Sequence, residues 1–166
     1  MATMENLADA FAGESQANRK YLAFSKQSEA DGFPEVARLF RAAAHAETVH
    51  AHAHLRAMGG VKKTLENLQE SIEGEHHEFQ KMYPPYLEES RKEGNRMAEI
   101  SFPNALAVEE IHHDLYQKAF AAVQGGADLQ ARQVYVCEIC GNTVYDAPPE
   151  KCEVCKVPKE RFTLID

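Results

Sequence analysis

The sequence of 166 residues predicts an all-α four-helix bundle followed by a small metal-binding module at the C-terminus. Three observations support this prediction. Apolar residues recur at helical spacing through four long segments, each of which ends beside a glycine. Two Glu-x-x-His motifs lie in the second and fourth segments. All four cysteines fall near the C-terminus as two Cys-x-x-Cys pairs.

The first two helices are predicted from the turn residues that bracket them. The first is expected over residues 3–30 and ends at Asp31-Gly32. The second begins at Pro34, because proline suits the first turn of a helix, and ends at Met58 before Gly59-Gly60. Their inner stripes are Leu7, Phe11, Glu14, Asn18 and Tyr21 on the first helix and Val36, Phe40, Ala43, Glu47, His50 and His54 on the second.

The third and fourth helices contain prolines that complicate their boundaries. The third is expected to begin with Thr64 as its N-cap, to be kinked or broken by Pro84-Pro85, and to end at Gly94-Asn95. The fourth ends at Gly125-Gly126, and it either begins at Pro103 or is kinked there. Their inner stripes are Leu68, Ser71, Glu75, Glu78 and Met82 on the third helix and Phe102, Ala105, Glu109, His112, Tyr116 and Ala119 on the fourth.

The C-terminal segment differs in character from the helices. Residues 125–133 are expected to form a linker, and the segment from Tyr135 onward is short, rich in turns and β-branched residues. Such a segment is too small for a sufficient core, so we expect a metal to hold it together. The predicted domains are the bundle over residues 1–128 and the metal-bound module over residues 129–166.

Composition and charge narrow the class of partner. The formal net charge of −8 argues against nucleic acid and anionic membranes, since both are bound by basic surfaces. The N-terminus lacks the basic and apolar regions of a secretory signal, and no run of apolar residues is long enough to span a membrane. In such a chain, paired cysteines favour metal binding over disulfide bonds, and we expect a cytoplasmic protein.

The strongest functional signal is the pair of Glu-x-x-His motifs, each with a helical glutamate 33 or 34 residues upstream. These residues are Glu14, Glu47 and His50 in the first half and Glu75, Glu109 and His112 in the second. Because residues i and i+3 share a helix face, each motif directs a carboxylate and an imidazole at one point. This is the ligand set of ferritin-like di-iron bundles. We therefore expect a ferritin-like bundle whose buried carboxylates bind two iron or manganese ions.

The fourth helix offers an alternative motif, Glu110 with His113, one position out of register. The apolar stripe through Tyr116 favours the motif of Glu109 with His112. It leaves Glu110 and His113 beside the inner face of the helix. The third helix has a surplus carboxylate, because Glu78 lies one turn beyond Glu75.

The cysteine spacing is typical of a tetrahedral site for one iron or one zinc ion. Its ligands are Cys137, Cys140, Cys152 and Cys155. Gly141, directly after the first pair, suits a turn that requires a positive φ. Spacing alone leaves both metals open. An oxygen-reactive di-iron site requires an electron donor, and this requirement favours iron.

The connection between the second and third helices limits how the bundle can assemble. Residues 59–63 span roughly 17 Å at most. A ferritin-like bundle places its first and third helices antiparallel. Within one chain, the connection between the second and third helices would then have to run back along a bundle that is roughly 35–40 Å long. We therefore expect a domain-swapped homodimer, in which the first two helices of one chain complete a bundle with the last two helices of another.

At these motifs the chain resembles the rubrerythrin family, over essentially its whole length. The resemblance is carried by Tyr21, by residues 13–17, 47–50, 75–78, 82–84, 109–112 and 115–116, and by the rubredoxin-like tail. It implies a non-haem peroxidase that reduces hydrogen peroxide to water at a carboxylate-bridged di-iron site. The implied cofactors are two irons in the bundle and one iron in the Cys₄ site of each chain.

The resemblance also implies roles for individual residues. Glu47 and Glu109 would bridge the two irons, and Glu14 and Glu75 would be terminal ligands. His112 would bind one iron, and Glu78 and His50 would alternate as ligands of the other. Tyr21 and Tyr83 would donate hydrogen bonds to the ligand carboxylates. The tail departs from rubredoxins at three positions. Lys156 replaces a glycine, and Glu138 and Glu153 replace prolines. Because a residue other than glycine is unfavourable in the left-handed conformation, we expect an altered second cysteine turn and a shifted redox potential.

The expected electron donor is an external rubredoxin or NAD(P)H-dependent reductase, because the chain has no Gly-x-Gly-x-x-Gly motif after a strand. Two other functions are considered beside the peroxidase. One is a ferritin-type ferroxidase that handles iron, and the other is a non-enzymatic helical module with a zinc ribbon. The Cys₄ tail favours the peroxidase over iron storage, since storage requires no re-reduction.

Overall fold

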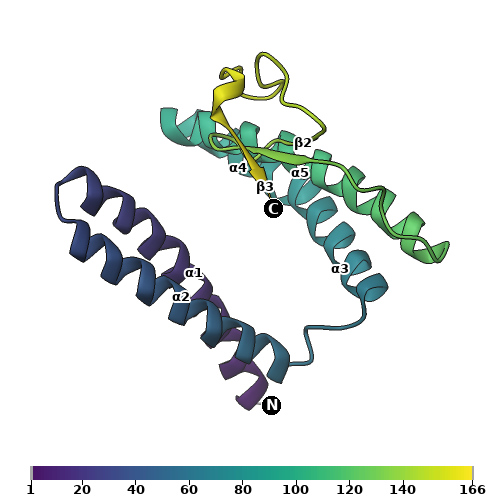
Figure 1. Cartoon of the computed structure of the whole chain (residues 1–166), viewed down its shortest axis with the longest axis horizontal. Coiled ribbons are helices and arrows are strands. Elements are labelled where there is room, and N and C mark those ends of the chain that lie inside the picture. The colour runs from purple at the N-terminus through teal and green to yellow at the C-terminus, as the bar shows by residue number, and fades with distance from the viewer. Residues whose placement is uncertain (1, 166) are drawn as a thin grey trace. The chain divides into compact units, whose positions relative to one another are not determined.

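The computed structural model describes residues 2–165, and packing divides the chain into two units between Lys62 and Lys63. The predicted all-α architecture with a small C-terminal metal module is confirmed (Figure 1). The first two helices contact each other, whereas the later helices and the strands contact one another. The domain boundary after residue 128 stays a prediction, because packing groups the C-terminal strands with the helices that precede them.

The first unit is a helical hairpin of α1 (Ala2–Ala30) and α2 (Pro34–Ala57), which lie side by side in Figure 1. Pro34 begins α2 as predicted. Asn18 fixes the register of the pair, because its amide donates to the Ala44 carbonyl at 2.6 Å and to the Thr48 hydroxyl at 2.8 Å. This register brings the helical turn of Glu14 opposite that of Glu47.

The hairpin buries only small side chains among its described residues. These are Ser25, Ala37, Ala44 and Ala51. Large apolar side chains remain exposed, as Phe33 and Leu39 do at 60% and 68%. A pair of helices with so little core gains little free energy from apolar burial, so it requires a further surface for stability.

The second unit begins with an almost continuous helical rod. It comprises α3 (Thr64–His77), the π-helical turn η1 (Glu78–Met82) and α4 (Tyr83–Glu93). In the π turn the Tyr83 amide donates to the Glu78 carbonyl, five residues earlier. The kink or break predicted at Pro84-Pro85 thus takes the form of a widened turn. The two prolines follow at the start of α4, where their missing N–H groups are tolerated.

Two helix starts differ from the sequence predictions. Lys63, not Thr64, is the N-cap of α3, and no side chain caps it. The helix α5 (Arg96–Gln124) begins well before Pro103, which lies inside it. Asn95 sets this earlier start, because its side chain accepts a hydrogen bond from the Ala98 amide at 3.2 Å. The predicted ends at Gly94 and at Gly125 are confirmed.

The C-terminal module is an antiparallel sheet in the order β2-β1-β3. Its strands are β1 (Val134–Cys137), β2 (Thr143–Tyr145) and β3 (Phe162–Ile165), and the short 3₁₀ helix η2 (Lys159–Arg161) precedes β3. The module packs against α5 within the second unit. A Cβ atom on Gly141 would lie 3.6 Å from the buried Val108 side chain of α5.

None of the helices in the described residues has a stretch that is long and apolar enough to cross a membrane.

Candidate metal centres

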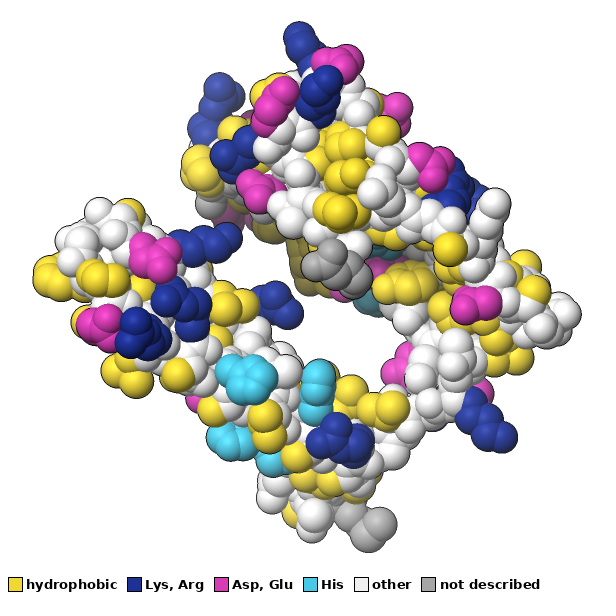
Figure 2. Space-filling model, viewed as in Figure 1, with side chains coloured by type: hydrophobic (Ala, Val, Ile, Leu, Met, Phe, Trp, Pro, Cys, Tyr) yellow, Lys and Arg dark blue, Asp and Glu magenta, His cyan; other side chains and the backbone are white. Residues whose placement is uncertain are grey.

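The first carboxylate–histidine cluster lies in the hairpin. Glu14, Glu47 and His50 each offer a donor atom, and these atoms lie within 4.8 Å of one another. The His50 Nδ1 atom is 3.0 Å from the Glu47 Oε2 atom, as expected for residues one helical turn apart. We name this group the first half-site. Figure 2 shows histidine side chains gathered on this hairpin, where α2 contributes His45, His50, His52 and His54.

The two carboxylates of the first half-site interact through a hydrogen bond that shifts their pKa values in opposite directions. A hydrogen bond to Glu47, together with burial, raises the pKa of Glu14. Hydrogen bonds from His50 and Glu14 lower the pKa of Glu47. Carboxylates that compete for a proton at this spacing also suit a shared metal ion, because its charge replaces the proton.

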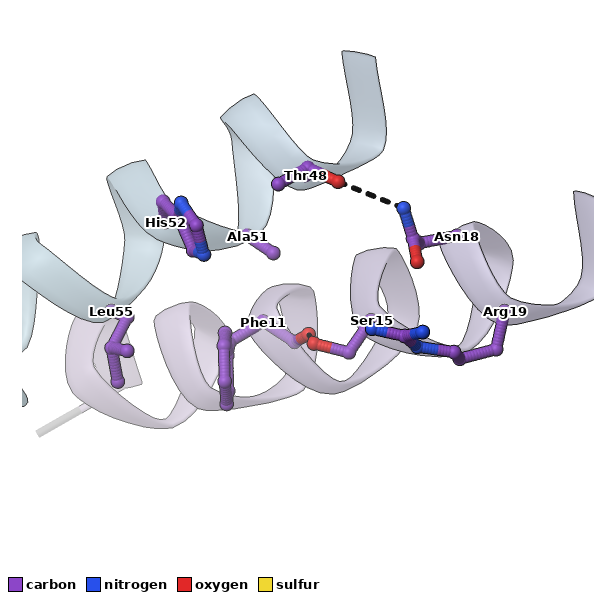
Figure 3. Close-up of a pocket in the computed structure, with 8 residues that line it drawn as sticks. All are labelled: Phe11, Ser15, Asn18, Arg19, Thr48, Ala51, His52 and Leu55. Carbon is purple, nitrogen blue, oxygen red and sulfur yellow. Dashed lines mark hydrogen bonds between the residues drawn. The ribbon is translucent and has the colours of Figure 1, made fainter. Parts of the chain in front are cut away.

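A pocket between α1 and α2 lies beside this half-site but does not include it (Figure 3). Its lining residues are Phe11, Ser15, Asn18, Arg19, Thr48, Ala51, His52 and Leu55. In Figure 3 the hydrogen bond from Asn18 to Thr48 crosses between the two helices. None of the three metal donors lines the pocket. We therefore interpret the pocket as a gap between the two packed helices and not as part of the metal site.

The second carboxylate–histidine cluster lies between α3 and α5. Glu75, Glu109 and His112 offer donor atoms within 4.8 Å of one another, and we name them the second half-site. The His112 Nδ1 atom lies 3.0 Å from Glu109 Oε2. Burial, followed by the charge of Glu109, raises the pKa of Glu75 to about 7. A pair of carboxylates held this closely is stabilised by a proton or by a cation.

Glu78 and Tyr83 flank the second half-site at the two ends of the π turn. Burial and the Glu109 charge raise the pKa of Glu78. Burial, followed by the charges of Glu109, Glu78 and Glu75, raises the pKa of Tyr83. The Glu78 carboxylate is therefore near the cluster, although it lies outside the 4.8 Å group. Glu78 thus begins a turn whose backbone hydrogen bonds differ from those of an α-helix.

The structure places Tyr21 differently from Tyr83. Its ring contacts Phe40 at 6.1 Å and Phe24 at 6.4 Å between centroids. These contacts put Tyr21 in an aromatic cluster of the hairpin, and its role beside the carboxylates stays a prediction.

The four cysteines form a compact group with the dimensions of a tetrahedral metal site. Their Sγ atoms are 3.7 Å apart between Cys137 and Cys155 and 3.6 Å apart between Cys140 and Cys152. Four sulfurs at about 2.3 Å from one ion would be about 3.8 Å apart, so a single ion fits, whereas a disulfide requires about 2 Å. All four thiols are free.

The surroundings of the cysteines stabilise the Cys152 thiolate, whereas burial raises the pKa of Cys140 and of Cys155. Burial alone would raise the pKa of Cys152, but N–H groups of Cys155 and Val154 and the Asn142 amide lower it to about 6. The two cysteine turns have matching hydrogen bonds, from Gly141 N to Cys137 O at 2.9 Å and from Lys156 N to Cys152 O at 3.0 Å. The second turn therefore forms even though its residue after the pair is not glycine.

Two side chains near the second half-site were not predicted from the sequence as site residues. Thr143 of β2 lies 3.0 Å from the His112 Nε2 atom. The Tyr116 hydroxyl has a pKa raised by burial and then by the charges of Glu75 and Glu109. The helical spacing placed Tyr116 on the inner stripe, which was a usable signal. Nothing in the sequence pattern signals Thr143, because its contact with α5 depends on the docking of the module.

Two carboxylate–histidine clusters on helices, joined to a Cys₄ module, define the chain as a ferritin-like non-haem metalloprotein with a rubredoxin-like domain. The rubrerythrin family model matches residues 5–120, and the model described as the rubredoxin-like domain of rubrerythrin matches residues 135–163. The chain therefore belongs to the rubrerythrin family. Members of this family have a di-iron site and a rubredoxin-like Fe–Cys site, and the donor clusters of this chain fit both.

Similar proteins cover nearly the whole chain. Rubrerythrin-2 of Clostridium acetobutylicum is 36% identical, over 96% of this chain and 95% of its own length. Nigerythrin of Nitratidesulfovibrio vulgaris is 32% identical, over 98% of this chain and 86% of its own. The solved structure of fully reduced, all-ferrous nigerythrin has a TM-score of 0.58 at 30% identity and covers 98% of this chain and 86% of that chain.

Proposed function

We propose that the chain reduces hydrogen peroxide to water at a di-iron site, with electrons that pass through the Cys₄ iron. The overall reaction breaks the O–O bond, consumes two electrons and two protons, and releases two waters. The observation that supports this proposal most is the packing of the Cys₄ module against α5, the helix that contains Glu109 and His112. An iron-storage protein has no need for a redox centre in this position.

The proposed di-iron site combines the first half-site of one chain with the second half-site of another. Each half-site offers two carboxylates and one imidazole, which is half of the ligand set of a di-iron bundle. The short connection from Met58 to Lys63 and the small core of the hairpin support this domain-swapped dimer. The exposed apolar side chains of α1 and α2 would be covered by α3 and α5 of the second chain.

The proposed ligand roles are those that the resemblance to rubrerythrins implies, and the grouping of the donors in two clusters supports them. Glu47 and Glu109 would bridge the two irons, Glu14 and Glu75 would be terminal ligands, and His112 would bind one iron. His50 and Glu78 would alternate on the other iron. When bound, the irons supply electrons and Lewis acidity to the reaction.

Two contrasts support the alternation of His50 with Glu78. The His50 side chain is 56% exposed, whereas that of His112 is 28% exposed and hydrogen-bonded through both ring nitrogens. Glu78 also begins the π turn, a conformation that is frequently found at functional sites. His112 is held in place by its contacts, whereas His50 and Glu78 are less restrained. This difference suits a site in which only one of the two irons changes its ligand.

Residues of the chain also supply the proton chemistry. The raised pKa of Glu78, caused by burial and by Glu109, suits a carboxyl that carries a proton toward a bound peroxide. Tyr83, at the other end of the π turn, would hold the ligand carboxylates by hydrogen bonding.

The electrons would come from an external rubredoxin or an NAD(P)H-dependent reductase. The free, metal-binding cysteines suit a reducing compartment, which supports the proposed cytoplasmic location.

The alternative is a ferritin-type ferroxidase, and iron uptake separates the two functions. In one assay, the purified protein would be supplied with ferrous iron in air. In a separate assay, it would be supplied with peroxide and a rubredoxin reductase system. The proposal predicts sustained peroxide consumption with iron constant at three atoms per chain. Accumulation of many more irons per chain, without peroxide turnover, would establish the ferroxidase instead.

A further inference from the structure

The pocket between α1 and α2 has an apolar floor (Figure 3). Phe11 of α1 and Leu55 of α2 line it, and Ala51 beside them is only 6% exposed. Two of the lining side chains, those of Ser15 and Ala51, are small, and a free volume of about 220 Å³ remains between the helices. This volume is smaller than that of pockets for drug-sized ligands, so it suits a small molecule.

Most polar groups in the wall of this pocket are already committed to the hairpin itself. The Ser15 hydroxyl donates to the Phe11 carbonyl at 2.6 Å, and the Thr48 hydroxyl donates to the Ala44 carbonyl at 3.1 Å. The Asn18 amide donates to that same carbonyl at 2.6 Å and to the Thr48 hydroxyl at 2.8 Å. These groups hold the two helices together and have no further hydrogen to offer a ligand.

Two donors of the wall remain unused. Arg19 of α1 and His52 of α2 form no ion pair and no side-chain hydrogen bond with any other residue that the structure describes. Figure 3 shows the Arg19 side chain extending along α1 to Ser15, and His52 pointing from α2 toward α1. A guanidinium without a carboxylate partner is suited to bind an anionic group through two parallel hydrogen bonds.

The charge around the pocket also favours an anion. Arg19 lines a second hollow further along the two helices, together with Lys26 and Arg41. The carboxylate in that lining, Glu29, is bonded to Arg41 at 2.7 Å. Arg19 and Lys26 therefore leave this part of the hairpin positively charged, although the chain has a net charge of −8. A local excess of cations raises the concentration of anions near it.

We propose that the pocket between α1 and α2 binds a small organic carboxylate that has an apolar group. The carboxylate pairs with Arg19 and accepts a hydrogen bond from His52, and the apolar group lies on Phe11 and Leu55. An inorganic anion would use the cation and leave the apolar floor unfilled. None of the metal donors lines this pocket, so the site does not depend on the proposed peroxide chemistry.

Benzoate is the probe for this site, because it joins a carboxylate to a flat apolar ring. Acetate keeps the carboxylate and lacks the ring, and benzyl alcohol keeps the ring and lacks the charge. Each would be titrated into the metal-loaded, full-length protein by calorimetry and by ligand-observed NMR. We expect benzoate to bind with a Kd of about 1 mM, in keeping with its size. Acetate and benzyl alcohol should bind at least about tenfold more weakly.

Three variants test the role of the guanidinium. Arg19→Gln removes the cation, and Arg19→Lys keeps the charge without the planar pair of donors. Lys20→Gln is the matched control, because it removes the same charge at the next position of α1 and Lys20 does not line the pocket. We expect benzoate affinity to fall about tenfold or more in Arg19→Gln, to fall less in Arg19→Lys, and to stay unchanged in Lys20→Gln. Metal content and circular dichroism would verify that all variants fold like wild type.

Three outcomes would overturn the proposal. Equal benzoate affinity in wild type and Arg19→Gln would show that benzoate binds elsewhere, for example at the metal ions. Acetate binding as tight as that of benzoate would show that the apolar floor is not used. Absence of binding by both methods at about 10 mM benzoate would show that the pocket takes no such ligand. None of these results bears on whether the chain reduces peroxide, so the two proposals fail separately.

Discussion

Lys156 adopts in the second cysteine turn the left-handed backbone conformation that Gly141 adopts in the first, with φ angles of +65° and +86°. A residue with a Cβ atom is strained in this conformation, whereas glycine is not. The Lys156 side chain compensates in part, because its ammonium donates to the Glu153 carbonyl at 2.5 Å. The two cysteine turns therefore share the same closing backbone hydrogen bond but differ in backbone strain.

Lys156→Gly is expected to stabilise the C-terminal module by about 1 kcal/mol, because it removes this strain. The measurement is the urea midpoint for loss of the metal-bound module. Lys156→Ala is the matched control, since it removes the same charge and keeps the Cβ atom. Equal stabilisation by alanine would show that the lysine charge, and not the backbone, is responsible.

The raised pKa of Glu75 predicts a specific pH dependence of the metal-free protein. Burial and Glu109 raise this pKa from 4.5 to about 7, so the folded state binds the proton more tightly than the unfolded state. The stability that Glu75 contributes is therefore fully present below pH 4.5 and is lost as the pH rises through 7. Glu75→Gln should remove this loss. The urea midpoint of the variant minus that of wild type should therefore increase as the pH rises.

Glu110→Gln is the control for that experiment, because Glu110 is exposed and lies outside the second half-site. Its midpoint should follow that of wild type across the same pH range. Parallel pH profiles for wild type and Glu75→Gln would contradict the proposed carboxylate pair.

Glu78→Ala is expected to retain iron and to lose most peroxide turnover, by about 100-fold, because it removes a proton carrier and an alternating ligand. Metal analysis and steady-state peroxide consumption would be measured together. Glu73→Ala is the control on the same helix, since Glu73 is exposed and bonds only to Gln69 among its described contacts. Undiminished turnover in Glu78→Ala would count against the ligand alternation.

The swapped dimer predicts that two inactive variants regenerate activity when mixed. Glu47→Ala damages the first half-site, and Glu109→Ala damages the second. In a swapped mixed dimer one site receives both damaged halves and the other receives both intact halves. After co-refolding, half of the dimers are mixed, so about one quarter of wild-type activity should return. Mixed dimers without activity would show that each chain builds its own site.

The helix ends were predictable from the sequence because they depend on local residues. Gly94 ends α4 in the left-handed conformation, and Pro34 begins α2. The half-sites were predictable because residues one turn apart on a helix share a face. Both kinds of signal depend only on residues that are near in sequence.

The remaining features depend on residues that are distant in sequence or on small shifts in backbone bonding. The π turn at Glu78 adds one residue to a helical turn, and the apolar pattern around Pro84-Pro85 does not distinguish it from a kink. Asn95 begins α5 earlier than Pro103 suggests, through one side-chain hydrogen bond. The contact of Thr143 with His112 joins residues 31 positions apart, so it requires the docked structure.

A single turnover of the fully reduced protein under anaerobic conditions tests the proposed peroxidase function most directly. Iron and zinc would be quantified first, and the visible spectrum would then be followed after addition of less than one equivalent of hydrogen peroxide. We expect three irons per chain, consumption of the peroxide, and the appearance of the strong colour of a ferric Cys₄ centre. A Cys₄ site that contains zinc, or one that stays reduced while peroxide is consumed, would contradict it.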